Sequence, residues 1–278
     1  NSPQILSFFG LETVVKVVPI TDGLGNHSYI VKTSQGEFVI KFLVTQKPVG
    51  IENDLAVQKQ LLQIHVNTPT YLSNKVNEYI YTEDNQQAVV SKKMSGITPR
   101  YASKGLAYSI GRTLALFHKC IITLPHPLKG WMSPDMFGMH TKEAKLLFGR
   151  NLPQGITHGD MHLGNILVDP KKPDIVHAIF DFEEVGEDVL LVDLARSIMG
   201  VCYSKDEERL MPELIQAEIQ GYESVRKLSD DEKTLLPQAV AYAADVCIKW
   251  FVDHKYEKYV EQHRKLAKSF DKFSLLKK

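Results

Sequence analysis

The chain has 278 residues, 44% of them hydrophobic and 24% charged, which is the composition of an ordinary globular protein with a sizeable core. Its 33 basic residues balance 33 acidic ones, which removes the whole-chain attraction expected of proteins that bind nucleic acid or anionic membranes. No apolar run approaches the roughly 20 residues of a membrane span, and residues 1–10 lack the pattern of a signal peptide. Because the three cysteines are scattered, we expect a cytoplasmic protein with reduced thiols. The balanced charge and the lack of a long apolar run lead us to expect no nucleic acid or membrane partner.

The first third of the chain predicts an antiparallel sheet with one helix. Three β-prone runs separated by turn residues occupy residues 14–20, 28–33 and 37–44. Residues 51–64 have helical periodicity, and residues 70–90 predict two or three more strands.

Composition and periodicity change at residues 91–96, where we place a hinge. The hinge separates an N-terminal lobe, residues 1–93, from a larger and mostly helical C-terminal lobe, residues 94–278. Within the second lobe, helical spacing or capping patterns predict helices at 103–120, 134–148 with an interruption at Gly138, 193–203, from Ser204, 230–254 and 255–270, and short strands at 166–168 and 175–180. The fold class is therefore α+β.

A turn with two glycines, Gly23 and Gly25, joins the first two predicted strands. Glycines let the backbone approach a ligand closely and offer its N–H groups to phosphate oxygens. The full Gly-x-Gly-x-x-Gly pattern is missing, and an ordinary hairpin loop is the alternative.

Lys41 lies in the apolar third strand, an awkward place for a strongly hydrated ammonium unless it points outward or meets an anion. One interpretation is an outward-facing lysine. The other is a lysine that grips nucleotide phosphates, as in the Val-Ala-Ile-Lys pattern of kinases. In the following helix, Glu52 is the best candidate to pair with Lys41, Asp54 is an alternative, and a surface carboxylate is the simpler interpretation of both.

The most informative stretch is residues 157–165, where Asp160 and Asn165 lie five apart on a loop rich in glycine and histidine, followed by Asp181 after an apolar run. Phosphoryl transfer needs Mg²⁺ held by hard oxygen ligands, a lysine on the phosphates, and a carboxylate that orients or deprotonates the attacking hydroxyl. Asn165 and Asp181 can supply the metal ligands, which leaves Asp160 as the base. His158 and His162 raise the alternative of a metal site, but no third ligand is near, and a structural role is favoured.

The pattern His-Gly-Asp-x-His-x-x-Asn at residues 158–165, extended by Asp-Phe-Glu at 181–183 and Asp-Leu-Ala-Arg at 193–196, resembles the aminoglycoside phosphotransferase and choline/homoserine kinase superfamily, relatives of protein kinases. The resemblance covers nearly the whole chain and implies a protein-kinase-like fold. It implies these roles: Asp160 as catalytic base, Asn165 and Asp181 on Mg²⁺, Lys41 on the phosphates, Glu52 orienting Lys41, the turn from Gly23 to Ser28 over the nucleotide, adenine near Lys92 to Met94, and His158 and Asp193 supporting the catalytic loop.

We therefore expect a kinase that transfers the γ-phosphate of ATP or GTP to a hydroxyl of a small metabolite or antibiotic. A protein substrate is disfavoured because Gly159 stands where protein kinases have Arg, and Glu183 replaces the Gly of their Asp-Phe-Gly motif. Glu183 and Glu184 are candidates to attract an amine-bearing acceptor, with a solvated acidic loop as the alternative. The rival function is a non-catalytic module that binds a nucleotide or metabolite.

Overall fold

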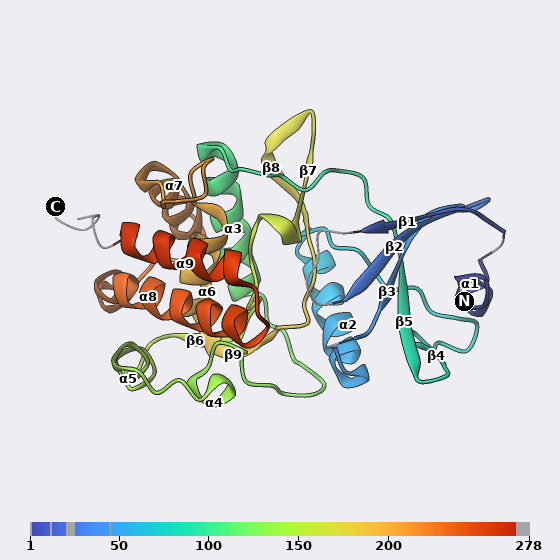
Figure 1. Ribbon diagram of the computed structural model, residues 1–278, viewed down its shortest axis with the longest axis horizontal. Helices are drawn as coiled ribbons and strands as arrows, with labels where there is room; N and C mark the ends of the chain where they lie inside the picture. The colour runs from blue at the N-terminus through green and yellow to red at the C-terminus, as the bar shows by residue number, and fades with distance from the viewer. Residues whose placement is uncertain (1, 12, 21–25, 45, 271–278) are drawn as a thin grey trace.

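The computed structural model describes residues 2–11, 13–20, 26–44 and 46–270, which fold into two lobes (Figure 1). An antiparallel sheet dominates the first lobe and helices dominate the second, which confirms the predicted α+β, kinase-like architecture. The turn with Gly23 and Gly25 lies outside the described residues.

The sheet of the first lobe has five antiparallel strands in the order β1-β2-β3-β5-β4. Their bounds are β1 (Val14–Ile20), β2 (His27–Thr33), β3 (Gly36–Phe42), β4 (Tyr81–Glu83) and β5 (Gln86–Lys92). The short helix α1 (Ser2–Phe8), which the sequence pattern did not predict, contributes to a small core with one face of this sheet through Ile5 and Leu6. Since neighbouring side chains alternate across a strand, Ile40 enters this core while Lys41 points to the other face, which lines a cleft between the lobes.

Helix α2 (Pro48–Gln63) belongs to the first lobe in sequence but packs into the second. Its Val57 and Leu61 are fully buried in the core of the C-terminal lobe. The Asn53 side chain also donates to the backbone carbonyl of His126 at 2.8 Å and accepts from the His126 N–H at 3.0 Å. The helix is therefore attached to the C-terminal lobe, although the sheet belongs to the N-terminal lobe.

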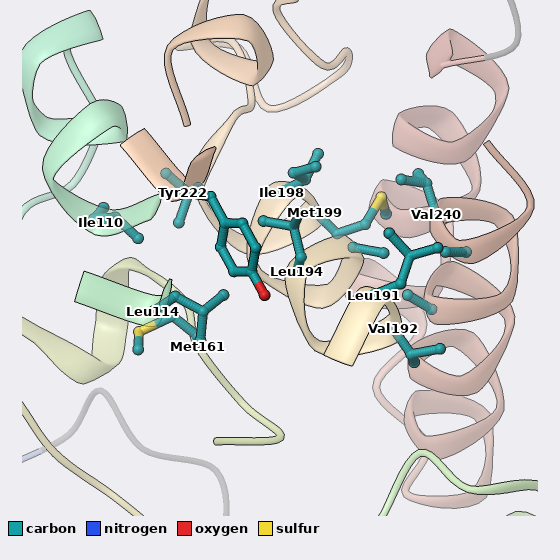
Figure 2. Close-up of a cluster of buried hydrophobic side chains, with 14 of the residues drawn as sticks. Ile110, Leu114, Met161, Leu191, Val192, Leu194, Ile198, Met199, Tyr222 and Val240 are labelled. Atoms are coloured by element: carbon teal, nitrogen blue, oxygen red, sulfur yellow. The ribbon is translucent and has the colours of Figure 1, made fainter. Parts of the chain in front are cut away.

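The C-terminal lobe is built from long helices around one core, shown in Figure 2. Its helices are α3 (Lys104–Lys119), α4 (Pro134–Phe137), α5 (Lys142–Phe148), α6 (Leu190–Val201), α7 (Pro212–Glu223), α8 (Asp230–Asp253) and α9 (Glu257–Phe270). Helices α3 and α7 approach closely where each has a glycine. A Cβ on Gly111 or Gly221 would lie 1.9 Å from a carbonyl oxygen of the other helix, so only glycine allows this distance. By length and composition α8 could cross a bilayer, but half of its most apolar window is buried in this lobe, as in a core helix.

Two small sheets carry the loops of interest. Strand β6 (Gln154–Thr157) pairs with β9 (Gly186–Val189), and β7 (Ile166–Asp169) pairs with β8 (Lys172–Ile179), with a 3-10 turn at Leu163–Asn165 before β7. Met161, next to Asp160, is fully buried in the core (Figure 2). The burial of Met161 thus fixes the loop of Asp160 to the core of the C-terminal lobe.

Most predicted elements of this lobe are confirmed, with two corrections. Ser229 and Glu232 form the expected capping box of α8. The predicted helix start at Ser204 is wrong, because the Ser204 hydroxyl bonds to Asp206 and accepts from the N–H of Arg209 in a turn. Helix α6 begins at Leu190, three residues before the predicted start at Asp193.

The buried carboxyl of Glu218 should make stability depend on pH. It accepts hydrogen bonds from Ser197 and Cys202, and the described residues place no basic group against it. Burial raises its pKa to about 7, against 4.5 for a free glutamate. Between these values the unfolded chain loses a proton that the folded chain keeps, so the free energy of unfolding should fall as pH rises, by about 3 kcal/mol.

Urea unfolding over this pH range should show that, in the Glu218→Gln variant, the free energy of unfolding falls by about 3 kcal/mol less than in the parent. Glu213→Gln, on the same helix, should behave like the parent. An unchanged pH dependence in Glu218→Gln would contradict the assignment.

Candidate active site

A cleft of about 720 Å³ separates the two lobes, and most of the residues predicted from sequence line it. These are Ser28, Lys41, Lys92, Met94, Asp160, Asn165, Asp181, Glu183 and Glu184. His158 and Asp193 lie beneath the cleft, fully or almost fully buried, and Glu52 lies outside it.

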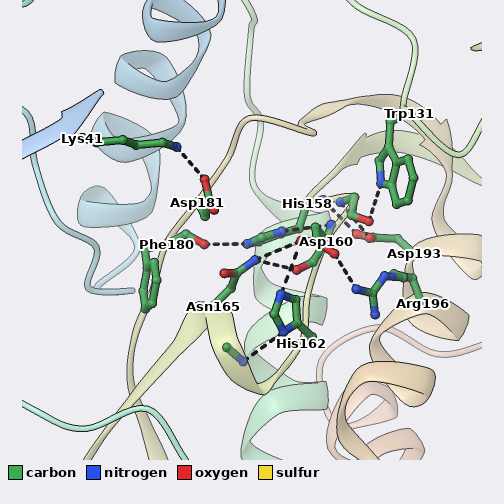
Figure 3. Close-up of polar contacts among 12 residues, drawn as sticks. Lys41, Trp131, His158, Asp160, His162, Asn165, Phe180, Asp181, Asp193 and Arg196 are labelled. Atoms are coloured by element: carbon green, nitrogen blue, oxygen red, sulfur yellow. Dashed lines mark hydrogen bonds and ion pairs between the residues drawn. The ribbon is translucent and has the colours of Figure 1, made fainter. Parts of the chain in front are cut away.

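Lys41 meets the predicted metal ligand across the cleft, as Figure 3 shows. Its Nζ is 2.8 Å from Asp181 Oδ1 and 3.8 Å from Glu183 Oε2. Burial alone would lower the pKa of Lys41, but these two carboxylates outweigh it and hold the pKa above its ordinary value. The site therefore presents a permanent cation beside acidic oxygens, and the interpretation of Lys41 as a solvent-facing lysine is wrong.

The expected pairing of Glu52 with Lys41 is wrong. The Glu52 side chain is 61% exposed, and its Oε2 lies 2.8 Å from Nε2 of His126. Asp54 is the α2 carboxylate directed to the site, because it shares the buried face of the helix with Ile51 and Val57. It accepts hydrogen bonds from Gln46 and Tyr71, and one of its oxygens is buried without a hydrogen-bond partner.

Burial raises the pKa of Asp54 to about 6, and the charge of Lys41 works against that rise. Asp54 and Lys41 are therefore near enough to feel each other's charge without a direct hydrogen bond. Asp54, not Glu52, is therefore the α2 carboxylate whose charge reaches Lys41.

Asp160 is held by two neighbours that were not predicted to contact it. Arg196 Nη2 lies 2.5 Å from its Oδ1, and His162 Nε2 lies 3.4 Å from its Oδ2 (Figure 3). Burial would raise the pKa of Asp160, but the charge of Arg196 holds it well below its usual range. The carboxylate thus stays ionised and can accept a hydrogen bond from a substrate hydroxyl.

Asn165 and Asp181 offer oxygens of the kind that a hard cation prefers. The Asn165 amide nitrogen donates to the carbonyl of Asp160 at 2.9 Å and to its Oδ2 at 3.3 Å, which leaves the amide oxygen available in the cleft. Asp181 adopts a left-handed backbone conformation, φ +68°, and its side chain is 32% exposed towards the cleft. Two oxygen ligands beside bound phosphates suit Mg²⁺, which takes few protein ligands when a phosphate supplies the others.

The described residues contain no cluster of three or more His, Cys, Asp or Glu side chains suited to a metal. His162 instead contacts Asp160, and its Nδ1 accepts from the N–H of Gly164 at 3.0 Å. The structural role favoured for the histidines agrees with these contacts.

Asp193 fixes the turn that carries Asp160. Its two oxygens accept from the backbone N–H groups of His158 and Gly159 at 2.8 and 2.9 Å, and Oδ2 also lies 2.8 Å from His118 Nε2. Gly159 has φ +81°, and a Cβ there would lie 2.5 Å from the carbonyl oxygen of Glu184, so only glycine fits this turn. Burial would raise the pKa of Asp193, but these hydrogen bonds hold it below its usual value.

His158 links the turn to the strand before Asp181. Its Nδ1 accepts from the N–H of Asp160 at 3.3 Å, and its Nε2 faces the carbonyl of Phe180 at 3.2 Å. Since a carbonyl only accepts, the proton must be on Nε2, and burial lowers the pKa of His158, which keeps the ring neutral. One imidazole therefore couples Asp160 to the residue before Asp181.

Three further supports were missed by the sequence analysis. Arg196 was visible as part of the Asp-Leu-Ala-Arg motif, three residues after Asp193 on the same helical face. Trp131 donates from its indole N–H to the carbonyl of Gly159 at 2.6 Å, and His118 bridges Asp193 to the hydroxyl of Tyr222. No local pattern marks Trp131 or His118, because their partners lie at least 28 residues away.

Aromatic rings from α8, α9 and their junction also line the cleft. Trp250 stacks on His254 at 4.1 Å between ring centroids, and Phe251 stacks on Tyr259 at 5.2 Å. The Glu184 carboxylate lines the same cleft and has no hydrogen bond or ion pair to any described residue.

Burial raises the pKa of Glu184 to about 8 and that of Glu183 to about 7, and the neighbouring acids add to both shifts. Asn26 donates to Glu183 at 2.6 Å, and Lys41 is near it, so Glu184 is the acid left to meet a ligand.

Removing the charge of Asp193 should loosen the turn. We expect Asp193→Asn to lower the free energy of unfolding by roughly 3 kcal/mol, because an amide cannot accept all three hydrogen bonds of this buried carboxylate. Urea denaturation measures the change. Asp253→Asn, in an exposed pair with Lys249, should cost less than about 1 kcal/mol. Equal costs for the two variants would contradict the role given to Asp193.

Comparisons with known proteins place these observations in a family. Homoserine kinase of Gluconobacter oxydans is 23% identical over 266 residues, covering 86% of this chain and 82% of that protein. Homoserine kinase of Sinorhizobium fredii is 24% identical over 277 residues, covering 91% and 82%.

Solved structures share the fold at lower identity. A microcompartment-associated aminopropanol kinase has a TM-score of 0.74 at 17% identity, covering 95% of this chain and 94% of its own. Amicoumacin kinase hAmiN, solved with AMP-PNP, Ca²⁺ and Ami, has a TM-score of 0.72 at 14% identity, covering 98% and 94%. A family model described as "Phosphotransferase enzyme family" matches residues 16–228. Because this match spans well over half of the chain, the protein belongs to the phosphotransferase enzyme family.

Proposed function

We propose that this protein transfers the γ-phosphate of ATP or GTP to the hydroxyl of a small acceptor that carries an ammonium group. The observation that carries the proposal is the convergence of Lys41, Asp160, Asn165 and Asp181 on one cleft, from three separate segments of the chain. These are the groups that phosphoryl transfer requires.

The nucleotide occupies the part of the cleft under the sheet. Apolar side chains there, including Ile30, Val39 and Leu167, can enclose a base next to the hinge residues Lys92 and Met94. Lys41 then exchanges its bond to Asp181 for the phosphates, and Asp54 behind it keeps the ammonium oriented. Ser28 pairs with Lys41 in the sheet register and also lines the cleft, so it lies beside the same phosphates.

Asn165 and Asp181 would hold a divalent cation, for which we propose Mg²⁺. Such a cation would supply positive charge to offset the negative charge that develops on the transferred group. The side-chain nitrogen of Asn165 is already committed to Asp160, so its oxygen is the atom available to a metal. The Asp181 carboxylate lines the same cleft and would be the second ligand.

Asp160 orients the acceptor hydroxyl and accepts its proton. As the acceptor oxygen bonds to the γ-phosphorus, the bond between that phosphorus and the β,γ-bridging oxygen breaks, and its electron pair leaves with the nucleoside diphosphate. Arg196 keeps Asp160 ionised, so its first role is to accept the hydrogen bond that aligns the hydroxyl, and the proton moves late in the step. Arg196 acts through Asp160 as a positioning residue.

The acceptor binds in the part of the cleft that Glu184 lines, and the aromatic rings of α8 and α9 line the same cleft. A carboxylate without a partner suits an ammonium, which aromatic rings also attract through their π-electrons. Homoserine and aminopropanol, the substrates for which two relatives are named, both carry an amine and a hydroxyl, in agreement with this class. The rival interpretation, a non-catalytic binding module, does not explain why the complete phosphoryl-transfer set is present.

A screen of nucleotide consumption tests the proposal. ATP and GTP are each offered with homoserine, aminopropanol, choline, amino sugars and aminoglycosides, with and without Mg²⁺. The Asp160→Asn variant should lose at least about 10²-fold in kcat, since a general base contributes roughly 10²–10⁴. The exposed Asp231→Asn is the matched control and should retain activity. Turnover of none of these acceptors, or near-normal turnover by Asp160→Asn, would refute the proposal.

Acceptor binding should depend on the ionisation of Glu184. Its pKa is about 8, so the carboxylate that attracts an ammonium forms as pH rises through this value. The KM for an amino alcohol should therefore fall roughly tenfold between pH 7 and 8.5. In Glu184→Gln the KM should be high and insensitive to pH, whereas Glu187→Gln, at an exposed position of β9, should follow the parent. A parent KM that is constant with pH would count against an ammonium at Glu184.

A further inference from the structure

His263 of α9 lines the active-site cleft, and neither the proposed metal site nor the proposed nucleotide site uses it. It is 8% exposed, and its ring centroid lies 4.8 Å from that of Phe251 on α8, the helix beside α9 in Figure 1. The charges of Arg196 and Asp160 both act on the His263 ring, so the ring is near the proposed catalytic base. His263 therefore lies in the part of the cleft where an acceptor would meet Asp160.

The contacts of His263 determine which of its nitrogens is left for a ligand. Nδ1 lies 3.0 Å from the backbone carbonyl of Tyr259, on the preceding turn of the same helix. Since a carbonyl only accepts, Nδ1 carries the proton, and burial lowers the pKa of the ring to about 4, which keeps it neutral. Nε2, the nitrogen farther from the helix backbone, is then a hydrogen-bond acceptor, and no described residue donates to it. A mostly buried acceptor of this kind is satisfied when a ligand brings a donor to it.

The same cleft has little free positive charge to offer an acceptor. Four lysine and arginine side chains of the described chain line it, and three of them already meet a carboxylate. These pairs are Lys41 with Asp181 at 2.8 Å, Lys93 with Glu37 at 3.3 Å and Arg196 with Asp160 at 2.5 Å. The fourth, Lys92, ends β5 beside the proposed site of the nucleotide base. A carboxylate on the acceptor would thus find no unpaired lysine or arginine near Asp160 among the described residues, and the ionised Glu184 in the same cleft would repel it.

We propose that His263 accepts a hydrogen bond from the acceptor through Nε2, and that the acceptor is an amino alcohol without a carboxylate. This inference rests on the proposed kinase function and narrows its acceptor class. A hydroxyl or an ammonium can donate to Nε2, whereas a carboxylate would place a second hydrogen-bond acceptor against it. Homoserine, for which relatives of this chain are named, has such a carboxylate, so this chain should prefer a different compound.

Two compounds that differ only in the carboxylate test the substrate class. Homoserine and 3-aminopropan-1-ol carry their hydroxyl and ammonium on the same three-carbon spacing. Release of nucleoside diphosphate is followed at about pH 8.5, where Glu184, with a pKa of about 8, is mostly ionised. We expect kcat/KM to be at least about tenfold higher for 3-aminopropan-1-ol, because like charges that meet in a cleft cost binding energy. A higher value for homoserine would overturn the inference and leave the kinase function standing, whereas turnover of neither compound would count against both.

Variants at residue 263 test the role of the histidine. His263→Phe keeps a ring against Phe251 but removes the acceptor, so the KM for 3-aminopropan-1-ol should rise roughly tenfold while kcat changes less. His263→Gln, which can offer an amide oxygen, should recover part of this loss. Nucleotide binding by calorimetry should stay at the parent value in both variants, which shows that the fold is intact.

His140→Phe is the matched control, because His140 is exposed and does not line the active-site cleft. It should leave KM and kcat at their parent values. An unchanged KM in His263→Phe would overturn the role of Nε2. A fall in kcat and in nucleotide affinity without a rise in KM would also overturn it, because His263 would then only support the structure.

Discussion

The buried carboxylate of Asp193 is the interaction on which the active site depends. A charge removed from water must have all its hydrogen-bond partners, and Asp193 obtains them from two consecutive backbone N–H groups, those of His158 and Gly159, and from His118. Those two peptides form the turn that leads directly to Asp160. Because Arg196 lies one helical turn after Asp193, a single helix, α6, holds both the backbone and the carboxylate of the catalytic loop.

The cleft joins two bodies that hold different parts of the chemistry. Lys41 is carried by the sheet, whereas Asp54, whose charge acts on it, is carried by α2, and α2 is attached to the C-terminal lobe by Asn53 and by its buried apolar face. A change in the angle between the sheet and the second lobe would therefore alter the distance from Lys41 to both Asp54 and Asp181. A nucleotide that contacts both the sheet and the second lobe would therefore change the position of Lys41 relative to the two carboxylates.

Local patterns predicted most of the fold because the order of apolar, polar and turn residues along one helix or strand reflects which side of it is buried and where it ends. The β-prone runs and turn residues of β1 to β3, the helical spacing in α3 and the capping box of α8 were all visible in the sequence. Strands β6 and β9 were not, because each is four residues long and is stabilised by a partner some thirty residues away. Ser204 and Glu207 match a capping box, yet hydrogen bonds to Asp206 and Arg209 made a turn instead.

By itself the sequence determined the kinase-like α+β class and singled out the residues that we propose for the chemistry, Lys41, Asp160, Asn165 and Asp181, since their types and order are those that phosphoryl transfer needs. Tertiary structure alone decided how they are supported. Glu52 and Asp54 are both acids near the start of α2, and burial of one helical face selected Asp54. Trp131, His118 and Arg196 acquire their roles only when segments distant in sequence are brought within hydrogen-bonding distance, a relation that no local pattern encodes.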